Sequence, residues 1–400
     1  AWELRELGDI VGIYDGVHQT PNYQNSGIMF LSVENIATLK SSKFISEEDF
    51  KRDYKVYPQE NDILMTRIGD VGTTNVVTDN GLKAYYVSLA LLKYKGTDPY
   101  FLSNAIQSDY VQKGLANRTL KTAIPMKINK DEIGKVSVML PLSATEQQQI
   151  GTYFRTLDHL ITLHQRKCET LQKLKKSMLQ KMFPKNGSCF PEIRFAGFTD
   201  AWEQRELGEC METVTDYVAA GSFADIAENV QYKTFPDFAQ LIRTVDLKHE
   251  FKNNDYIYVD KKAFDYLWKV NLNVECIILP NIGANIGEVY YIEPSSLPYE
   301  NNVLGPNAIF LKAKDSTKFM YTLLQADDFQ NKLYVSIASS GQPKFNKTEL
   351  KAIKILIPNS AEQEKIGAYF RTLDHLITLH QRKLETLKKL KKAMLQKMFI

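Results

Sequence analysis

The longest regular hydrophobic pattern in the chain lies between residues 150 and 183. Side chains that are apolar or weakly polar recur there at spacings of three and four, at Leu157, Ile161, His164, Cys168, Leu171, Leu174, Met178 and Met182. This is the stripe of an amphipathic, coiled-coil-like helix. Residues 366–399 repeat the stripe. Ser143–Glu146 and Ser360–Gln363 have the spacing of a capping box, so we expect the helices to begin there.

The two helical segments belong to an internal repeat. They differ at four of 34 positions, and AWELRELG at residues 1–8 returns as AWEQRELG at residues 201–208. An amphipathic helix is stabilised mainly by packing of its apolar face, and short connections favour antiparallel pairing of the two copies. We therefore expect a pseudo-twofold internal repeat, with two globular domains separated by an antiparallel pair of long coiled-coil helices.

The segments between the repeated helices are patterned as short strands. The runs IMFLSV, NVVTD and KVSVML in the first half, and YIYV, CIILP and KILIP in the second, are separated by polar loops rich in Gly, Asn and Ser. This pattern predicts a mixed α/β (α+β) fold. The expected divisions are a first globular domain at 1–145, helix 1 at 146–183, a linker at 184–200, a second globular domain at 201–360 and helix 2 at 361–400.

Two loops correspond in character between the halves. Residues 63–77 and 277–291 each follow an apolar run and each carry two glycines, Gly69 with Gly72 and Gly283 with Gly287. Such loops can bring backbone close to a phosphate, although a simple turn is the alternative interpretation. The chain has neither the Walker nor the Rossmann glycine pattern, so nucleotide binding of those two kinds is not indicated.

Composition and charge are those of a globular protein, and the distribution of charge indicates a partner surface on the helices. The chain has 400 residues, with 44% hydrophobic and 24% charged residues, which is typical of an ordinary globular protein. Its net charge of +3 combines +5 on residues 150–183 and +6 on residues 366–399, which leaves −8 elsewhere. The two copies are nearly identical on every face and carry this basic charge, so we expect the helices to dock a protein partner.

Catalytic and metal-binding patterns are missing from the sequence. Four of the six histidines lie in the repeated helices, and His18 and His249 are not beside a Ser or Cys nucleophile pattern. Cys168, Cys189, Cys210 and Cys276 lack CxxC spacing, so reduced thiols without a metal are expected. No apolar run approaches the roughly 20 residues that cross a bilayer, and a cytoplasmic protein is expected.

The order of these elements resembles the specificity subunit of type I restriction-modification systems. The most specific motifs are E-Q-x-x-I-G-x-[YF]-F-x-x-L-D-x-L-I, at Glu146–Ile161 and Glu362–Ile377, and L-K-K-x-M-L-Q-x-M-F at the helix ends. D-G-x-H-x-T-P-x-Y at Asp15–Tyr23 and S-G-Q-P-K-F-N at Ser340–Asn346 are also similar to family patterns. The resemblance covers the whole chain.

This resemblance implies a DNA-reading role. Each globular domain would be a target-recognition domain that reads one half of a bipartite double-stranded DNA target, and the helices would set the spacing and bind two methyltransferase subunits. Those subunits methylate adenine N6 with S-adenosylmethionine, and restriction (motor-nuclease) subunits add ATP-driven cleavage. The chain itself would be non-catalytic and bind no cofactor, because S-adenosylmethionine, ATP and Mg belong to the partner subunits, and no membrane is involved.

Candidate contact residues follow from side-chain type and position. Arg, Lys, Asn, Gln and Thr read base edges and phosphates, and the family pattern adds the first three residues of the DNA-contact set. That set is His18, Thr20, Tyr23, Arg67, Thr73, Thr74, Asn75, Arg118, Lys121, Arg243, Asn281, Asn285, Gln342 and Lys344. Polar residues at equivalent places in both helices form the partner-binding set: Arg155, Asp158, His159, Arg166, Lys175, Arg371, Asp374, His375, Arg382 and Lys391.

Two other classes of protein remain as alternatives. A structural coiled-coil adaptor with protein-binding ends would explain the helices, but not why the two ends differ in polar loops. A nuclease or methyltransferase fused to a recognition module is the third possibility. The sequence has neither the N-P-P-[FY] nor the F-x-G-x-G methylase motif, which counts against the methyltransferase version.

Overall fold

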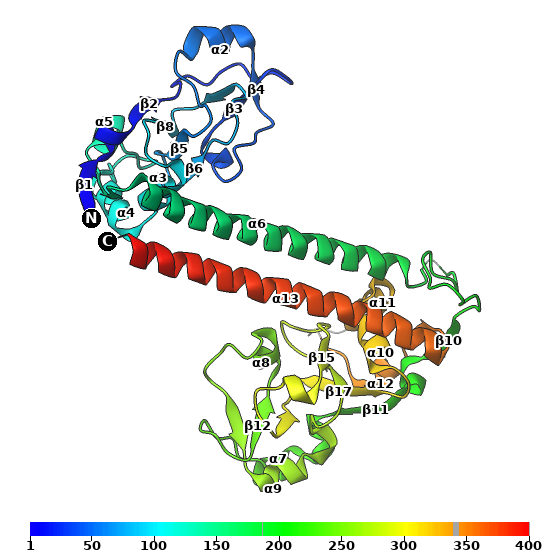
Figure 1. Ribbon diagram of the computed structural model, residues 1–400. Coiled ribbons are helices and arrows are strands. Elements are labelled where there is room, and N and C mark those ends of the chain that lie inside the picture. Colours follow the sequence, from blue (N-terminus) through cyan, green and yellow to red (C-terminus); the bar gives the residue numbers. More distant parts are fainter. Residues whose placement is uncertain (186, 339–343, 400) are drawn as a thin grey trace. The chain divides into compact units, whose positions relative to one another are not determined.

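The computed structural model describes residues 1–185, 187–338 and 344–399. Two compact units are formed by the chain, one from Ala1–Arg166 with His380–Ile400 and the other from Lys167–Leu379. We call these the first unit and the second unit. Each unit contains one globular domain and parts of both long helices, α6 and α13 (Figure 1).

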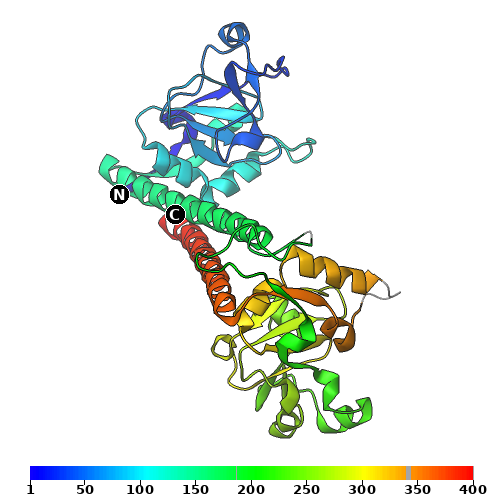
Figure 2. The same ribbon diagram turned by 90° about the vertical axis from the view of Figure 1, so that its right-hand side faces the viewer.

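The first domain is the globular part of the first unit. Its strands are β1 (Trp2–Glu6), β2 (Gly12–Asp15), β3 (Ile28–Leu31), β4 (Phe44–Ile45), β5 (Ile63–Thr66), β6 (Thr74–Val76), β7 (Lys83–Tyr85), β8 (Leu89–Lys93) and β9 (Ser137–Pro141). Its helices are α1 (Leu7–Ile10), α2 (Glu47–Asp53), α3 (Pro99–Ile106), α4 (Asp109–Arg118) and α5 (Lys130–Gly134). In Figure 2 the cyan helices lie between the blue sheets and the green start of α6.

The second domain is the globular part of the second unit. Its strands are β10 (Glu203–Glu206), β11 (Met211–Asp216), β12 (Ala239–Ile242), β13 (Ile257–Val259), β14 (Cys276–Pro280), β15 (Tyr290–Ile292), β16 (Asn302–Leu304), β17 (Ala308–Ala313) and β18 (Lys354–Ile357). Its helices are α7 (Phe223–Asn229), α8 (Thr244–Lys248), α9 (Lys261–Tyr266), α10 (Thr317–Leu323), α11 (Asp327–Ala338) and α12 (Lys347–Lys351).

The two domains have the same strand topology. The first has an antiparallel four-stranded sheet in the order β2-β8-β5-β6, a three-stranded sheet β4-β3-β7 and a pair β1-β9. The second has the equivalent sheets β11-β17-β14-β15, β13-β12-β16 and β10-β18. In both three-stranded sheets one pairing is antiparallel and the other parallel. The mixed α/β class and the internal repeat are thus confirmed, and each of the six predicted runs overlaps a strand.

The long helices are α6 (Ala144–Lys181) and α13 (Ser360–Met398). In the first unit Asp158 of α6 pairs with Lys391 of α13 at 2.6 Å, and His164 lies against His380. The second unit has the equivalent ion pair, Lys175 with Asp374, also at 2.6 Å. Residue numbers rise along α6 as they fall along α13, so the segments are antiparallel, as the repeat predicts.

Two details of the helix prediction are wrong. Leu174, assigned to the buried stripe, is 37% exposed, whereas the neighbouring Lys175 side chain is only 16% exposed. An α-helix has about 3.6 residues per turn, whereas apolar residues spaced alternately three and four apart repeat about every 3.5 residues. The apolar stripe therefore rotates slowly around the helix, and a later member such as Leu174 turns away from the contact. The second helix is capped by Asn359, whose Oδ1 accepts from the Glu362 amide at 3.0 Å, and not by Ser360.

An aromatic cluster in each unit anchors one end of a long helix. In the first unit Phe399, which follows α13, packs against Trp2, Phe101 and Phe154 at ring distances of 5.5 to 6.3 Å. In the second unit the equivalent Phe183, which follows α6, packs against Trp202, Phe319 and Phe370 at 5.8 to 6.1 Å. Each globular core therefore includes the end of one long helix and the beginning of the other.

Candidate nucleic-acid interface

The glycine loops are rigid turns held by a helix. Gly72 and Gly287 both have positive φ, +98° and +81°, which favours glycine. Gln112 Nε2 donates to the carbonyl of Gly72 at 3.0 Å and to that of Ile106 at 2.8 Å. The equivalent Gln330 Nε2 bonds the carbonyls of Gly287 and Leu324 at 3.1 and 2.6 Å. The two loops were predicted to correspond, and each is held by an equivalent glutamine through equivalent hydrogen bonds.

A second loop lies beside each glycine loop. In the first domain the Gly69 amide donates to the Met126 carbonyl at 2.8 Å, which joins the glycine loop to the polar loop that follows α4. Arg118 is the last residue of α4 and Lys121 lies in the loop; both belong to the predicted DNA-contact set and both are exposed. Arg118 has a solvent-accessible ion pair with Glu132 at 3.6 Å. The two residues therefore remain accessible to a nucleic acid.

The same juxtaposition occurs in the second domain. The Phe345 amide donates to the Asn281 carbonyl at 3.2 Å, and Asn281 Nδ2 donates to the Phe345 carbonyl at 3.1 Å. Lys344 is exposed and pairs as an isolated bridge with Ile282. Asn285 lies in the same glycine loop and is partly buried. Three predicted contact residues are thus brought together, whereas Gln342 lies outside the described residues.

The side chains of several other predicted contact residues form hydrogen bonds or ion pairs within the first domain. Arg67 is only 5% exposed, because its guanidinium pairs with Asp15 and its Nε donates to the Ile128 carbonyl at 3.0 Å. The Thr74 hydroxyl is buried against Ser103 at 2.9 Å. Asn75 Nδ2 donates to the Ile36 carbonyl at 2.8 Å. These three side chains therefore bond within the domain and stabilise it.

Thr73 and Arg243 also have internal partners. The Thr73 amide donates to the hydroxyl of Thr66 at 3.0 Å, which closes the start of the glycine loop. Arg243 pairs with Asp246 at 2.8 Å, and this carboxylate is fully buried. Two hydrogen bonds from its guanidinium to Asp246 hold Arg243 against the domain, and they also raise the pKa of Arg243.

The residues added by the family pattern are exposed. His18 and Thr20 line a polar pocket of about 570 Å³ that is closed on the other side by Asp49 and Arg52 of α2. Tyr23 is 46% exposed, with Lys43 Nζ 5.5 Å from its ring centre. An aromatic ring beside a cation, next to a polar pocket, is able to contact both base and phosphate.

The predicted partner-binding residues divide into two groups. Asp158, Lys175, Asp374 and Lys391 form the ion pairs between the long helices. Arg155 stacks on Tyr100 at 4.6 Å and Arg371 on Tyr291 at 4.0 Å, so both hold their own domain against a helix. The remaining members are exposed and free to meet a partner: His159, Arg166, His375 and Arg382.

Exposed leucines of the long helices were missed by the sequence prediction. Leu163 is 44% exposed and its repeat counterpart Leu379 is 52% exposed, while Leu174 and its counterpart Leu390 are 37% and 36% exposed. Each unit carries one such leucine from each helix. For Leu163 and Leu379 the signal was present in the sequence, because an apolar residue retained at the same off-stripe position in both copies is unexpected on a solvated face.

Chemistry-bearing groups form no cluster in the described part of the chain. Groups of three or more His, Cys, Asp or Glu side chains able to hold a metal are absent from those residues. Burial raises the pKa values of the Cys168 and Cys276 thiols, which favours the unreactive protonated form. Among the described residues, no helix is both long enough and apolar enough to span a membrane.

A comparison with known protein families also divides the chain into two similar halves. Residues 1–173 and 200–389 match the family described as type I restriction modification DNA specificity domain. The chain belongs to this family. It is a type I restriction-modification specificity subunit with two target-recognition domains, and the family acts on DNA together with other subunits.

Individual relatives extend over the same length. The type I restriction enzyme MjaVIII specificity subunit of Methanocaldococcus jannaschii is 23% identical over 404 residues, covering 98% of this chain and 91% of the relative. A crystal structure of a type I restriction-modification S subunit from M. genitalium has a TM-score of 0.66 at 15% identity. It covers 100% of this chain and 96% of its own. This structural likeness supports the fold assignment.

Proposed function

We propose that each target-recognition domain of this specificity subunit reads one half of a bipartite, asymmetric DNA sequence. The observation that carries this proposal is one strand topology built twice, with different loops at the same places. His18, Thr20, Tyr23, Arg118 and Lys121 are the accessible candidates in the first domain. Asn281, Asn285 and Lys344 are the accessible candidates in the second, and different side chains at equivalent loops select different base edges.

We propose further that the long helices set the spacing between half-sites and dock two adenine-N6 methyltransferase subunits. Restriction subunits join through those subunits. S-adenosylmethionine, ATP and Mg bind to the partners, and this chain is non-catalytic and works in the cytoplasm. The docking proposal is supported by the exposed leucines, which recur with matching exposure in both copies.

Methylome sequencing tests DNA recognition. Cells carrying the chain with its methyltransferase are sequenced by a single-molecule method that detects methylated adenines. A split motif with a fixed gap is expected, and replacing residues 1–145 by another first domain should change one half only. A continuous motif, or no motif, would contradict the proposal.

Subunit counting tests docking. Leu163→Glu should reduce the complex from two methyltransferase subunits to one, and Leu163→Glu with Leu379→Glu should remove both. Loss of a central apolar contact weakens an interface by about 2 kcal/mol or more, which is roughly thirtyfold in affinity. Native mass spectrometry reads the stoichiometry. The matched control is Thr170→Glu with Thr386→Glu, at exposed equivalent positions of the same helices, and an equal loss in the control would refute a leucine-centred surface.

A further inference from the structure

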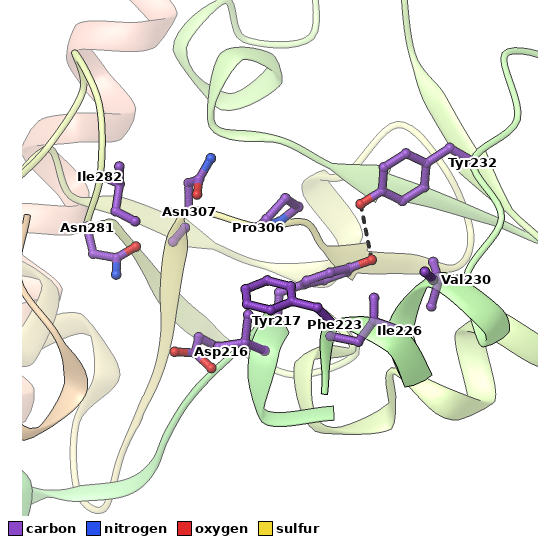
Figure 3. A pocket seen from close by; sticks show the side chains of 13 residues that line it. Asp216, Tyr217, Phe223, Ile226, Val230, Tyr232, Asn281, Ile282, Pro306 and Asn307 are labelled. Carbon is purple, nitrogen blue, oxygen red and sulfur yellow. Dashed lines mark hydrogen bonds between the residues drawn. The ribbon is translucent and has the colours of Figure 1, made fainter. Parts of the chain in front are cut away.

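The second domain contains an open pocket of about 470 Å³ at one edge of its four-stranded sheet. It lies where β11 ends, where β14 leads into the glycine loop and where β17 begins. Figure 3 shows Phe223 and Ile226 of α7 on one side and Asn281 and Asn307 at the far end. The volume falls in the range of sites that bind small ligands.

The walls of this pocket suit a flat ring with a polar edge. Most of the lining is apolar, with Ile226, Val230 and the ring of Phe223, which is 83% exposed at the mouth. Asn281 Oδ1 and the carboxamide of Asn307 have no hydrogen-bond partner within the described part of the chain. An apolar slot that ends in the free oxygen of Asn281 and the free carboxamide of Asn307 matches the stacking and edge hydrogen bonds that hold an unpaired base.

Cations border the same pocket. Lys347 Nζ pairs at 2.8 Å with Asp216, which lines the pocket. Lys269 Nζ donates at 2.9 Å to the carbonyl of Ala219, three residues after Asp216. Lys344 pairs with Ile282, which also lines the pocket. A base in the slot would therefore have its phosphates near ammonium groups, which is the charge arrangement that a nucleotide requires.

The first domain fills the equivalent place. Arg67 and Asn281 occupy the same position after β5 and β14, and their amides donate to the equivalent carbonyls of Ser88 and Asn307 at 3.0 and 3.2 Å. In the first domain the Arg67 side chain crosses this space to pair with Asp15. The shorter Asn281 leaves the space open in the second domain, where Lys347 neutralises the aspartate instead.

We propose that this pocket of the second domain receives a single unstacked nucleobase from the DNA that this domain reads. The inference rests on the proposed function, since it concerns the same DNA. An extruded base stacks on Phe223, its polar edge meets Asn281 and Asn307, and its flanking phosphates lie near the lysines. An apolar protein side chain would fit the apolar wall, but it would leave the Asn281 oxygen and the Asn307 carboxamide without a partner.

Photocrosslinking tests the pocket in the complete complex of this chain with its methyltransferase subunits. The probes are target duplexes with 5-iodouracil placed singly across the second half-site, either paired or opposite an abasic position, and irradiated in the near ultraviolet. Mass spectrometry should map one position to Phe223 or Tyr232, with a higher yield from the unpaired probe. Crosslinks confined to other residues, while DNA binding persists, would overturn the pocket proposal and leave DNA recognition intact.

A matched pair of variants completes the test. Phe223→Ala should lower the crosslink at that position about tenfold, because base stacking on an aromatic ring contributes on the order of 1 to 3 kcal/mol. Phe235→Ala, at an aromatic residue that is 61% exposed and does not line the pocket, should leave the yield unchanged. If Phe223→Ala weakens capture of the methyltransferase and not the crosslink, the pocket is a protein-docking site and the proposal is wrong. Failure of the complex to bind any DNA would refute the proposed function as well.

Discussion

Arg67 and Lys344 show how the fold decides which charged loop residues can meet DNA. Both were predicted as contacts from side-chain type, yet Arg67 is buried against Asp15 and Lys344 is exposed. Asp15 lies 52 residues earlier in the chain and reaches Arg67 only through the folded sheet. Residue type alone therefore predicts which side chains could contact DNA. It does not predict which of them will instead bond to a residue far away in the sequence.

The buried carboxylate of Glu362 is a residue whose stability role can be tested. Arg194 of the linker donates to both of its oxygens at 2.7 Å, and the Glu362 side chain is fully buried. Arg194→Ala leaves this charge unpaired, so a loss of about 3 to 5 kcal/mol in the second unit is expected. Thermal unfolding with hydrogen exchange on α13 measures it.

The control for Arg194 is another Arg–Glu pair. Arg205→Ala breaks a similar contact with Glu203, but both side chains are at least half exposed, so it should cost about 1 kcal/mol or less. Equal losses in the two variants would mean that burial does not govern the effect.

Gly69 and Gly72 form a matched test of the first glycine loop. Both have positive φ, but a methyl group at Gly72 would lie 2.5 Å from Gln112, whereas nothing lies within 4 Å of one at Gly69. Gly69→Ala should cost about 1 kcal/mol from backbone strain, and Gly72→Ala about 1 to 3 kcal/mol more from the clash. Denaturant unfolding measures the difference, and a larger loss for Gly69→Ala would contradict the described loop.

At the scale of elements, periodicity predicted the long helices and strand runs better than the pairing of strands. The helical stripe extends over many turns, so a shift at one position such as Leu174 does not hide it. The strands have two to six residues each, and short apolar runs do not specify their neighbours. Sheet order was therefore not predicted, although the repeat implied that both halves would share it.

The two equivalent ion pairs allow a comparison within one protein. Lys175 and Asp374 are 16% and 17% exposed, whereas Lys391 is 19% and Asp158 47% exposed. Less solvent strengthens electrostatic coupling, so an alanine double-mutant cycle should give a larger coupling for Lys175–Asp374. We expect it near the upper part of the roughly 0.5 to 3 kcal/mol range for contacting residues. The other pair is the internal control, and equal or reversed couplings would contradict this reading.

The histidine pair lies in the helix contact of the first unit and allows a test of its dependence on pH. Nδ1 of His164 and Nδ1 of His380 are 2.9 Å apart, so one must donate and the other accept. Burial, and then the charges of His380 and Lys383, lower the pKa of His164. Because the lowered pKa makes the folded state bind a proton less readily than the unfolded state, stability is highest above the ordinary value of about 6.5 and is lost as the pH falls from there toward the lower folded value.

We therefore expect the first unit to lose stability as the pH is lowered from 7.5 to 5.5, with faster hydrogen exchange in α13 around His380. His164→Gln should reduce this dependence. His159→Gln, at an exposed position on the same helix, should leave it unchanged. A pH dependence that persists in His164→Gln would assign the effect to other groups.

At the scale of the whole molecule, the internal repeat carried most of what the sequence could predict. It indicated two domains and two paired helices, and the family comparison agrees. What it could not show is that each globular core contains residues from both helices. Phe399 and Trp2 are almost 400 positions apart, and no periodicity links them.

Phe399→Ala tests this long-range dependence. Removing a buried phenylalanine costs about 3 to 5 kcal/mol, and the loss should appear in the first unit, as faster exchange in α3. Phe183→Ala should instead affect α10 of the second unit. Phe190→Ala, at a residue that is 53% exposed, should change neither. Exchange that rises in the second unit of Phe399→Ala would contradict the assignment of this residue to the first core.

The position of Phe399 in the first core also determines the order in which the protein is completed during synthesis. All residues of the second unit precede residue 380, whereas the first unit needs residues from both ends of the described chain. At about 5 to 20 residues per second, the second domain acquires its full core seconds before the first. The domain that leaves the ribosome first is therefore the last to close, and until then its aromatic cluster is open to chaperones or to a neighbouring copy.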